Sequence, residues 1–169
     1  MQVTIAIVHY GNLKVLLDCL QSIYQIHSKL IKEVIVVDND EKKVIKNKLL
    51  LSFPRVRYIS TLGNVGYGAG VNIGVETISS EFIFVLNADT KIFPDTVGNL
   101  VSVFKKNKRT AIVAPGLVNE KLQPYTQIGS SELTPIKGIF ALSFLNKLFP
   151  NNYFSRKYFM RDFQRKGVV

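Results

Sequence analysis

Residues 82–95, FIFVLNADTKIFPD, combine a strand, a polar turn and a helix start within one short stretch. The five apolar residues 82–86 are typical of a buried strand. The chain turns polar at Asn87, Ala88 and Asp89, and Pro94 suits the first turn of a helix, where its missing backbone N–H costs nothing. A turn, a helix cap and a metal site all use such residues, so this stretch alone leaves the role of Asp89 open.

The same alternation of strand and helix runs through most of the chain. Four other apolar runs predict strands, at residues 3–8, 33–38, 56–60 and 111–114. Helical spacing predicts helices at residues 12–26, 42–50, 70–78 and 94–107. This order predicts an α/β fold with a mostly parallel sheet and helices on both faces.

The composition is that of a globular chain whose basic excess is concentrated towards the C-terminus. Its 169 residues carry a formal net charge of +10 and suffice for one domain with a real core. Residues 133–169 hold 7 basic and 1 acidic side chains, against 15 and 11 in residues 1–132. Such a balance favours a negatively charged partner: a nucleic acid, a phosphorylated small molecule or an anionic membrane.

Cysteine usage and hydropathy bear on the compartment. Cys19 is the only cysteine, which excludes an internal disulfide, and its place in an apolar helical pattern favours a buried structural thiol over a nucleophile. The chain opens directly into a strand without a basic start or cleavage site, and its apolar runs are too short to span a bilayer. We therefore expect a cytoplasmic protein.

In open α/β sheets the ligand binds beyond the carboxyl ends of the strands. The groups at those ends are residues 8–10, 38–40, 60–70 and 87–89. Asp38 is placed to accept hydrogen bonds from a base or a ribose hydroxyl, and the alternative is an Asx-turn or helix cap by Asn39 or Asp40. His9 and His27 are more typical of structural histidines than of functional ones.

The glycine-rich segment GNVGYGAGVNIG, residues 63–74, follows a strand and precedes a helix, as a dinucleotide-binding turn does. The spacing G-x-G-x-x-G fails, because the sixth position is Val71 counted from Gly66 and Ile73 counted from Gly68. The segment also follows the third strand, not the first. Four glycines within nine positions nevertheless predict a close approach of the backbone to another group.

The order and spacing of four segments resemble glycosyltransferase family 2: VTIAIVHYGNLKVLLDCLQSI, EVIVVDND, GNVGYGAGVNIGV and FIFVLNADTKIFPD. They are similar in particular to bacterial rhamnosyltransferase-like enzymes of cell-surface polysaccharide synthesis. The resemblance covers residues 3–118 well and the remainder more loosely. It implies a GT-A fold, a Rossmann-like α/β domain that binds a nucleotide-diphosphate sugar, such as a UDP- or dTDP-sugar. It also implies an inverting, metal-dependent transfer to a saccharide or lipid-linked acceptor.

The resemblance implies roles for residues at the first two strand ends. Val8, His9 and Tyr10 would line the nucleoside pocket. Asp38 would hydrogen-bond the pyrimidine base, with Asn39 beside it. We expect residues 1–118 to form the donor-binding domain, and residues 119–169 a loop with a basic, aromatic tail at the beginning of the acceptor side.

It also implies a metal and diphosphate region. The turn from Asn64 through Gly66 to Asn72 would flank the ribose, the diphosphate and the sugar. Asn87 would begin the family's Asp-x-Asp position, and Asp89 would be the carboxylate ligand of Mg²⁺ or Mn²⁺. Asn at the first position departs from the general motif, although rhamnosyltransferase-like members often have Asn-Pro-Asp. It leaves one charged ligand, so the diphosphate would balance most of the ion's charge.

A catalytic base is missing from this comparison. The family's base is a carboxylate in an acidic motif well beyond the metal motif, and the acidic residues that follow Asp89 are in no matching context: Asp95, Glu120, Glu132 and Asp162. We therefore expect a chain that is incomplete at its C-terminus, truncated to the donor-binding half, and a poor transferase by itself. A catalytically incomplete nucleotide-sugar-binding module is the alternative.

The C-terminal segment and the charge leave further readings open. Residues 139–149, IFALSFLNKLF, place Phe140, Phe144 and Leu148 on one helical stripe, followed by basic residues. This stripe either contacts an anionic membrane surface peripherally or packs on the sheet or on a missing half. A basic nucleic-acid-binding domain is a rival, but no recognised motif supports it, and we expect no nucleic acid partner. A nucleotidyltransferase would need a glycine-rich basic loop directly after the first strand, which is missing.

Overall fold

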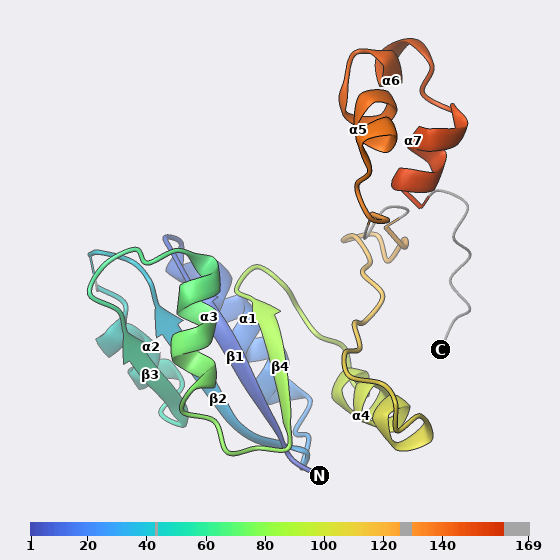
Figure 1. The fold of residues 1–169 in the computed structure, drawn as a ribbon. Coiled ribbons are helices and arrows are strands. Elements are labelled where there is room, and N and C mark those ends of the chain that lie inside the picture. The colour runs from blue at the N-terminus through green and yellow to red at the C-terminus, as the bar shows by residue number, and fades with distance from the viewer. Residues whose placement is uncertain (43, 126–129, 161–169) are drawn as a thin grey trace. The chain divides into compact units, whose positions relative to one another are not determined.

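The computed structural model describes residues 1–42, 44–125 and 130–160. The chain divides into two compact units, Met1–Val113 and Ala114–Val169. The first unit contains the sheet and the second contains short helices (Figure 1).

The first unit is built on a four-stranded parallel sheet with the strand order β3-β2-β1-β4. The strands are β1 (Val3–His9), β2 (Ile31–Asp38), β3 (Val56–Ser60) and β4 (Phe82–Asn87). β1 and β2 are the central strands, and helices pack on both of their faces. Every residue of β1 is buried, which explains why its sequence is a nearly continuous apolar run.

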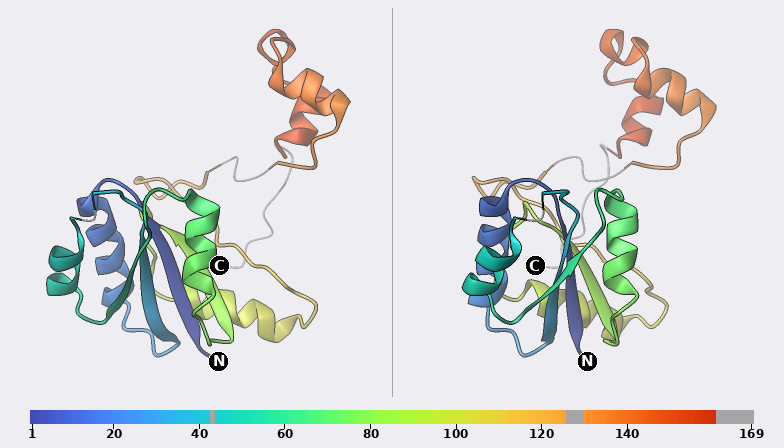
Figure 2. Two further views of the ribbon diagram at one scale, coloured as in Figure 1. Left: turned by 60° about the vertical axis from the view of Figure 1, so that its left-hand side comes forward. Right: turned by 90° about the vertical axis from the view of Figure 1, so that its left-hand side faces the viewer.

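Helices cover both faces of this sheet (Figure 2). On one face lie α1 (Leu13–Gln25) and α2 (Lys46–Ser52), whose Leu16, Leu20 and Leu49 are fully buried against Ile5 and Ile7 of β1. Asn12 caps α1 by accepting a hydrogen bond from the Lys14 backbone N–H, as its sequence position predicts.

On the other face lies α3 (Tyr67–Val75), packed against Val8, Ile35 and Val37. The helix α4 (Thr96–Lys106) buries Val97 and Val101 against the beginning of β1 and against β4. The sheet is thus parallel and covered on both faces, which confirms the α/β fold predicted from the alternation of strands and helices.

Some predicted elements differ from the structure. Residues 111–114, predicted as a fifth strand, form none: Ile112 is 88% exposed, and a short apolar run becomes a strand only where a neighbouring edge pairs with it. The helix predicted at residues 42–50 is observed from Lys46, and Lys43 lies outside the described residues. Pro94 lies in the turn before α4 and not in its first helical turn.

The second unit contains α5 (Pro135–Leu142), α6 (Leu145–Leu148) and α7 (Tyr153–Tyr158). The single helical stripe predicted over residues 139–149 is wrong, because α5 ends at Leu142 and the next residue, Ser143, has an extended ψ of 179°. Before these helices, an isolated antiparallel bridge joins Val118 and Pro124. None of the helices in the described ranges is both long and apolar enough to cross a bilayer. The basic residues at 161–166 lie outside the described residues.

Candidate functional site at the carboxyl end of the sheet

Parallel pairing brings the polar ends of the four strands to one edge of the sheet. His9 pairs with Asp38, Asp38 pairs with Ser60, and Val8 pairs with Asn87. This edge therefore holds residues from all four groups predicted from the sequence, although they are far apart along the chain. It is the edge at which open α/β sheets bind their ligands.

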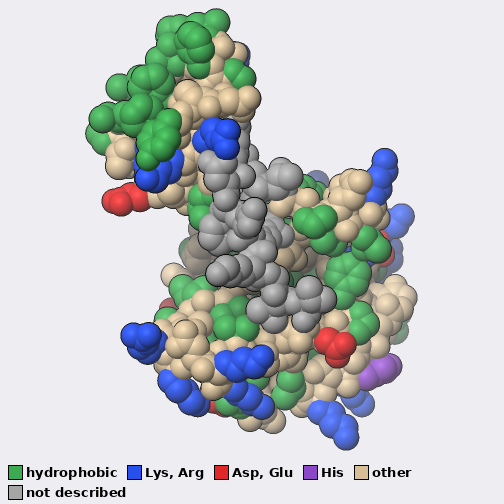
Figure 3. All heavy atoms as spheres, turned by 90° about the vertical axis from the view of Figure 1, so that its right-hand side faces the viewer, with side chains coloured by type: hydrophobic (Ala, Val, Ile, Leu, Met, Phe, Trp, Pro, Cys, Tyr) green, Lys and Arg blue, Asp and Glu red, His purple; other side chains and the backbone are tan. Residues whose placement is uncertain are grey.

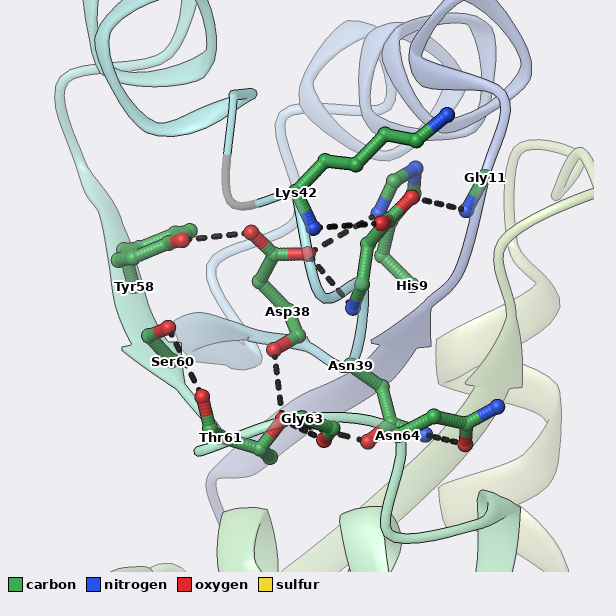
Figure 4. Close-up of polar contacts among 11 residues, drawn as sticks. His9, Gly11, Asp38, Asn39, Lys42, Tyr58, Ser60, Thr61, Gly63 and Asn64 are labelled. Atoms are coloured by element: carbon green, nitrogen blue, oxygen red, sulfur yellow. Dashed lines mark hydrogen bonds and ion pairs between the residues drawn. The ribbon is translucent and has the colours of Figure 1, made fainter.

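A buried carboxylate lies near the centre of this edge (Figure 4). The Tyr58 hydroxyl donates a hydrogen bond to Asp38 Oδ2 at 2.6 Å, and the Asp40 backbone N–H donates to Oδ1 at 3.2 Å. His9 Nδ1 lies 3.4 Å from the same Oδ1. Because Asp38 has no exposed surface, these groups take the place of water around its carboxylate.

Two of these partners are themselves unusual. Burial, and secondly the hydrogen bond to Asp38, raise the pKa of Tyr58 to about 12, so its hydroxyl remains a proton donor at neutral pH. His9 is fully buried, and among the described residues its Nε2 has no hydrogen-bond partner. A polar atom left without a partner in the interior is rare, and this one lies on the ring that borders the buried carboxylate.

Asn39 organises the turn that follows β3. Its Oδ1 accepts hydrogen bonds from the Val65 backbone N–H at 3.0 Å and from the Thr61 hydroxyl at 3.3 Å. Its Nδ2 donates to Asn64 Oδ1 at 3.0 Å, and the Gly66 backbone N–H donates to that same oxygen. The buried Asn39 amide therefore holds the glycine-rich turn in place, with both of its polar atoms occupied within the protein.

Asp40 joins the loops that follow β1 and β2. Its Oδ2 accepts from the Gly11 backbone N–H at 3.2 Å, and its Oδ1 accepts from the Lys42 N–H at 2.9 Å. The hydrogen bond from the Lys42 N–H has the largest effect and lowers the pKa of Asp40; desolvation opposes it, and the weaker effect of the hydrogen bond from Gly11 lowers the pKa further. The contact with Lys42 is the Asx-turn that the sequence left as an alternative for Asp40.

The glycines of the turn have two different roles. Gly66 caps α3 with φ 84° and ψ 161°, a conformation that is nearly restricted to glycine. Gly70 and Gly74 face the sheet: a Cβ at Gly70 would lie 3.0 Å from Val8 Cγ1, and one at Gly74 would lie 3.0 Å from Val37 Cγ2. The close approach predicted from the glycine spacing is therefore, at these two positions, an approach of helix to sheet.

The predicted metal position lies at the end of β4. Asn87 Oδ1 accepts a hydrogen bond from the Tyr67 hydroxyl at 2.9 Å, and the backbone carbonyl of Asn87 accepts from the Thr90 hydroxyl at 2.7 Å. Asp89 is exposed in this turn. Within the described ranges, no group of three or more His, Cys, Asp or Glu side chains is placed to hold a metal ion.

The remaining predicted site residues differ in exposure. Tyr10, just after β1, is 64% exposed, and Asn72 is exposed on α3. Val8 is buried and packs against Gly70, so its side chain forms the floor beneath α3. Sequence reasoning missed Tyr58 and Thr61. The sequence of β3, VRYIS, already contains Arg57 and Ser60, so the Tyr58 hydroxyl gave no local signal.

A parallel sheet with a polar carboxyl edge and a glycine-rich turn onto a covering helix defines the Rossmann-like class of α/β domains. The sequence matches the Glycosyl transferase family 2 model over residues 4–166. The chain therefore belongs to glycosyl transferase family 2, and its fold is the Rossmann-like GT-A fold of that family.

The chain is also similar to a glycan biosynthesis enzyme. It shares 25% identity over 125 residues with the low-salt glycan biosynthesis hexosyltransferase Agl10 of Haloferax volcanii, over 70% of this chain and 40% of that protein. The chain thus spans about two fifths of the length of the relative that it matches.

Proposed function

We propose that this chain carries the donor-binding part of a glycosyltransferase that moves a sugar from a nucleotide-diphosphate sugar to a saccharide or lipid-linked acceptor. The pathway would be cell-surface polysaccharide synthesis, at the cytoplasmic side of the membrane. Family membership supports the class of reaction. The observation that carries the donor site is the buried Asp38 carboxylate at the polar edge of the sheet, beside the glycine-rich turn.

The nucleoside would lie against the ends of β1 and β2. Tyr10 offers an exposed aromatic ring for the base. Asp38 is the acceptor proposed for the N–H of a pyrimidine, and its carboxylate is occupied before the ligand arrives. We propose that the base takes the place of the Tyr58 hydroxyl at Oδ2, because the backbone contact at Oδ1 belongs to the turn itself. UDP and dTDP present the same N–H group.

The diphosphate and sugar would follow the turn from Asn64 through Gly66 to Asn72, within the proposed donor domain of residues 1–118. Asn64 Oδ1 is fully engaged in shaping the turn, whereas Asn72 is exposed. Gly70 and Gly74 let α3 pack closely on the sheet, so that the turn leading into this helix stands beside the polar strand ends.

The residues at the end of β4 fit a hard divalent cation. Asp89 offers an exposed carboxylate, and the Asn87 side-chain oxygen has one lone pair left after its bond from Tyr67. One carboxylate suffices where a diphosphate supplies further oxygen ligands. Mg²⁺ or Mn²⁺ bound there would supply positive charge for the departing nucleoside diphosphate. An inverting, rhamnosyltransferase-like reaction is part of the proposal, and no residue of this chain is proposed as its base.

Calorimetric titration of the chain with UDP and with dTDP, with Mn²⁺ or with EDTA, tests the donor site. We expect saturable binding that weakens at least about tenfold in EDTA, and the same loss for Asp89→Asn in Mn²⁺. Glu76→Gln, which removes an exposed charge at the far end of α3, is the matched control. Binding that ignores both EDTA and Asp89→Asn would refute the metal assignment, and no binding of either nucleotide would refute the donor site.

A nucleotide-sugar-binding module without transferase activity is the second candidate. Its basis is that the acidic residues of this sequence after Asp89 stand in no context that matches the family's base: Asp95, Glu120, Glu132 and Asp162. A coupled assay for free UDP, with a UDP-sugar as the substrate, distinguishes the transferase from the binding module. Turnover above the buffer rate supports the enzyme, and tight binding without turnover supports the module.

A further inference from the structure

The helices of the second unit expose an apolar face that the proposed donor site does not use. Figure 3 shows hydrophobic side chains gathered over this unit, with Lys and Arg side chains at the border of the patch. The large apolar residues more than half exposed in this unit's helical region are Ile136, Ile139, Leu142, Phe144, Leu148, Phe149 and Tyr153. We call this set the outer face of α5–α7.

The exposed side chains of the outer face are not the hydrophobic core of this unit. α5 and α7 already bury their facing sides: the rings of Phe140 and Phe154 stack at 4.9 Å between centroids, and Ala141 is buried. The Ser155 hydroxyl donates to the Phe140 carbonyl at 2.9 Å, which ties the two helices together. The outer face is therefore left over after the unit has made its own internal packing, and such a contiguous apolar patch marks an interaction site.

The charge of the residues around this face indicates which kind of partner it would bind. The described residues 133–160, which contain the three helices, carry four basic side chains and no acidic one, and Glu132 directly precedes them. Lys147 is exposed between Phe144 and Leu148, and Lys157 Nζ lies 5.4 Å from the centre of the Tyr153 ring and 3.1 Å from its hydroxyl. The interior of a protein interface is depleted in lysine, whereas apolar side chains mixed with lysine and tyrosine are typical of a helix lying at an anionic lipid surface.

We propose that the outer face of α5–α7 docks on the surface of an anionic lipid bilayer, with its apolar side chains in the headgroup region and its lysines against lipid phosphates. The helices would lie along the surface, since each is far shorter than a bilayer crossing requires. This rests on the proposed function for its purpose, because a lipid-linked acceptor lies at that surface. It does not need an intact donor site.

The chain contains no tryptophan, so one introduced tryptophan reports on its own surroundings. We would add full-length Phe144→Trp to vesicles of phosphatidylcholine alone and of phosphatidylcholine with 30% phosphatidylglycerol. The emission of Phe144→Trp should shift to the blue and be quenched by brominated lipid with the anionic vesicles only. Leu51→Trp, at an 86% exposed position on α2, is the matched control and should not respond.

Flotation with the same anionic vesicles gives the affinity. We expect Phe144→Ser with Leu148→Ser to lower it at least tenfold, and Lys147→Gln to lower it several-fold at low salt but little at high salt. Leu51→Ser with Ile112→Ser removes two still more exposed apolar residues in the first unit and should change nothing.

Two results would overturn the proposal. One is the absence of both flotation and blue shift with anionic vesicles at low salt. The other is self-association in sedimentation that Phe144→Ser with Leu148→Ser abolishes while flotation persists, which would make the outer face a contact between copies or with another part of a longer protein. UDP titration of the same samples keeps the two proposals apart, because loss of vesicle binding with intact UDP binding refutes only the membrane contact.

Discussion

At the scale of single residues, Asp38 presents a question of access. Its carboxylate is buried, and the Tyr58 hydroxyl holds Oδ2 at 2.6 Å. A base that binds this oxygen competes with the tyrosine. Asp38 is therefore a ligand-binding residue only if the Tyr58 hydroxyl gives way.

This competition leads to opposite effects of Tyr58→Phe on stability and on binding. Losing a hydrogen bond to a buried carboxylate should lower the free energy of unfolding by about 1–2 kcal/mol. Removing the competitor should leave UDP affinity unchanged or raise it several-fold. Urea unfolding and calorimetry measure the two effects, with Tyr24→Phe on α1 as the control. Weaker UDP binding by Tyr58→Phe would show that the hydroxyl assists the ligand and does not compete with it.

Cys19 is the second residue whose environment has a measurable consequence, in this case for the ionisation of its thiol. It is buried beneath the end of β4, with its Sγ 3.7 Å from the Asn87 carbonyl oxygen, and burial raises its pKa to about 11. Because the pKa is raised above the ordinary value of 9.0, the protonated thiol is the favoured form in the folded state. The associated stabilisation is complete below pH 9 and is lost as the pH rises towards 11.

We expect the native thiol to react with Ellman's reagent at pH 8 at least about 100-fold more slowly than the unfolded thiol, from its lower ionised fraction alone. Stopped-flow absorbance with and without urea measures the ratio, and Cys19→Ser gives the blank. Equal rates in both states would mean that the helix α1 opens freely around this position.

At the scale of elements, α3 can pack on the sheet only because glycines face the strands at the contact. Gly74→Val would push side-chain carbons against Val37, where even a Cβ would lie only 3.0 Å away. We expect it to lower the free energy of unfolding by about 1–3 kcal/mol through overpacking. Gly68→Val is the matched control, since a Cβ there has no neighbour within 4 Å, and it should change stability by less than about 0.5 kcal/mol. Thermal unfolding compares the two variants. Equal losses of stability would mean that the loss of glycine's backbone freedom, and not overpacking against Val37, destabilises Gly74→Val.

The sequence correctly predicts those strands and helices whose pattern of apolar residues matches the pattern of buried residues in the structure. β1 and β2 are covered on both faces and read as apolar runs, and α1 shows its buried stripe at Leu16, Leu20 and Ile23. The errors lie where a tertiary partner decides. Residues 111–114 have strand composition without a paired edge, and the stripe over residues 139–149 continues across Ser143, where the backbone becomes extended.

The location of the candidate site was predictable from the sequence, but the hydrogen bonds between its residues were not. The rule that ligands bind at the carboxyl ends of parallel strands indicated Asp38 and the turn after β3. The partners of Asp38 depend on the register between β2 and β3, which brings Tyr58 within reach and which no local pattern contains. The same limit applies to Asn39, which was expected beside the base and is instead occupied by Val65, Thr61 and Asn64.

At the scale of the whole molecule, the proposed donor site and the outer face of α5–α7 belong to different compact units, Met1–Val113 and Ala114–Val169. Substitutions that share no contacting partners usually act additively. We therefore expect the chain to bind nucleotide and membrane independently. Any coupling between two ligands must appear equally in both affinities, so each measurement checks the other.

Four proteins test this independence: the wild type, Asp89→Asn, Phe144→Ser with Leu148→Ser, and the combination of all three substitutions. UDP affinity in Mn²⁺ should fall only where Asp89 is replaced, and vesicle affinity only where the outer face is replaced, with the combined variant showing both losses unchanged in size. Saturating anionic vesicles should alter UDP affinity less than about twofold, which is within about 0.4 kcal/mol. A larger change, matched by an equal effect of UDP on vesicle binding, would mean that the membrane contact sets the state of the donor site, because only a shared conformational equilibrium links the two ligands in this way.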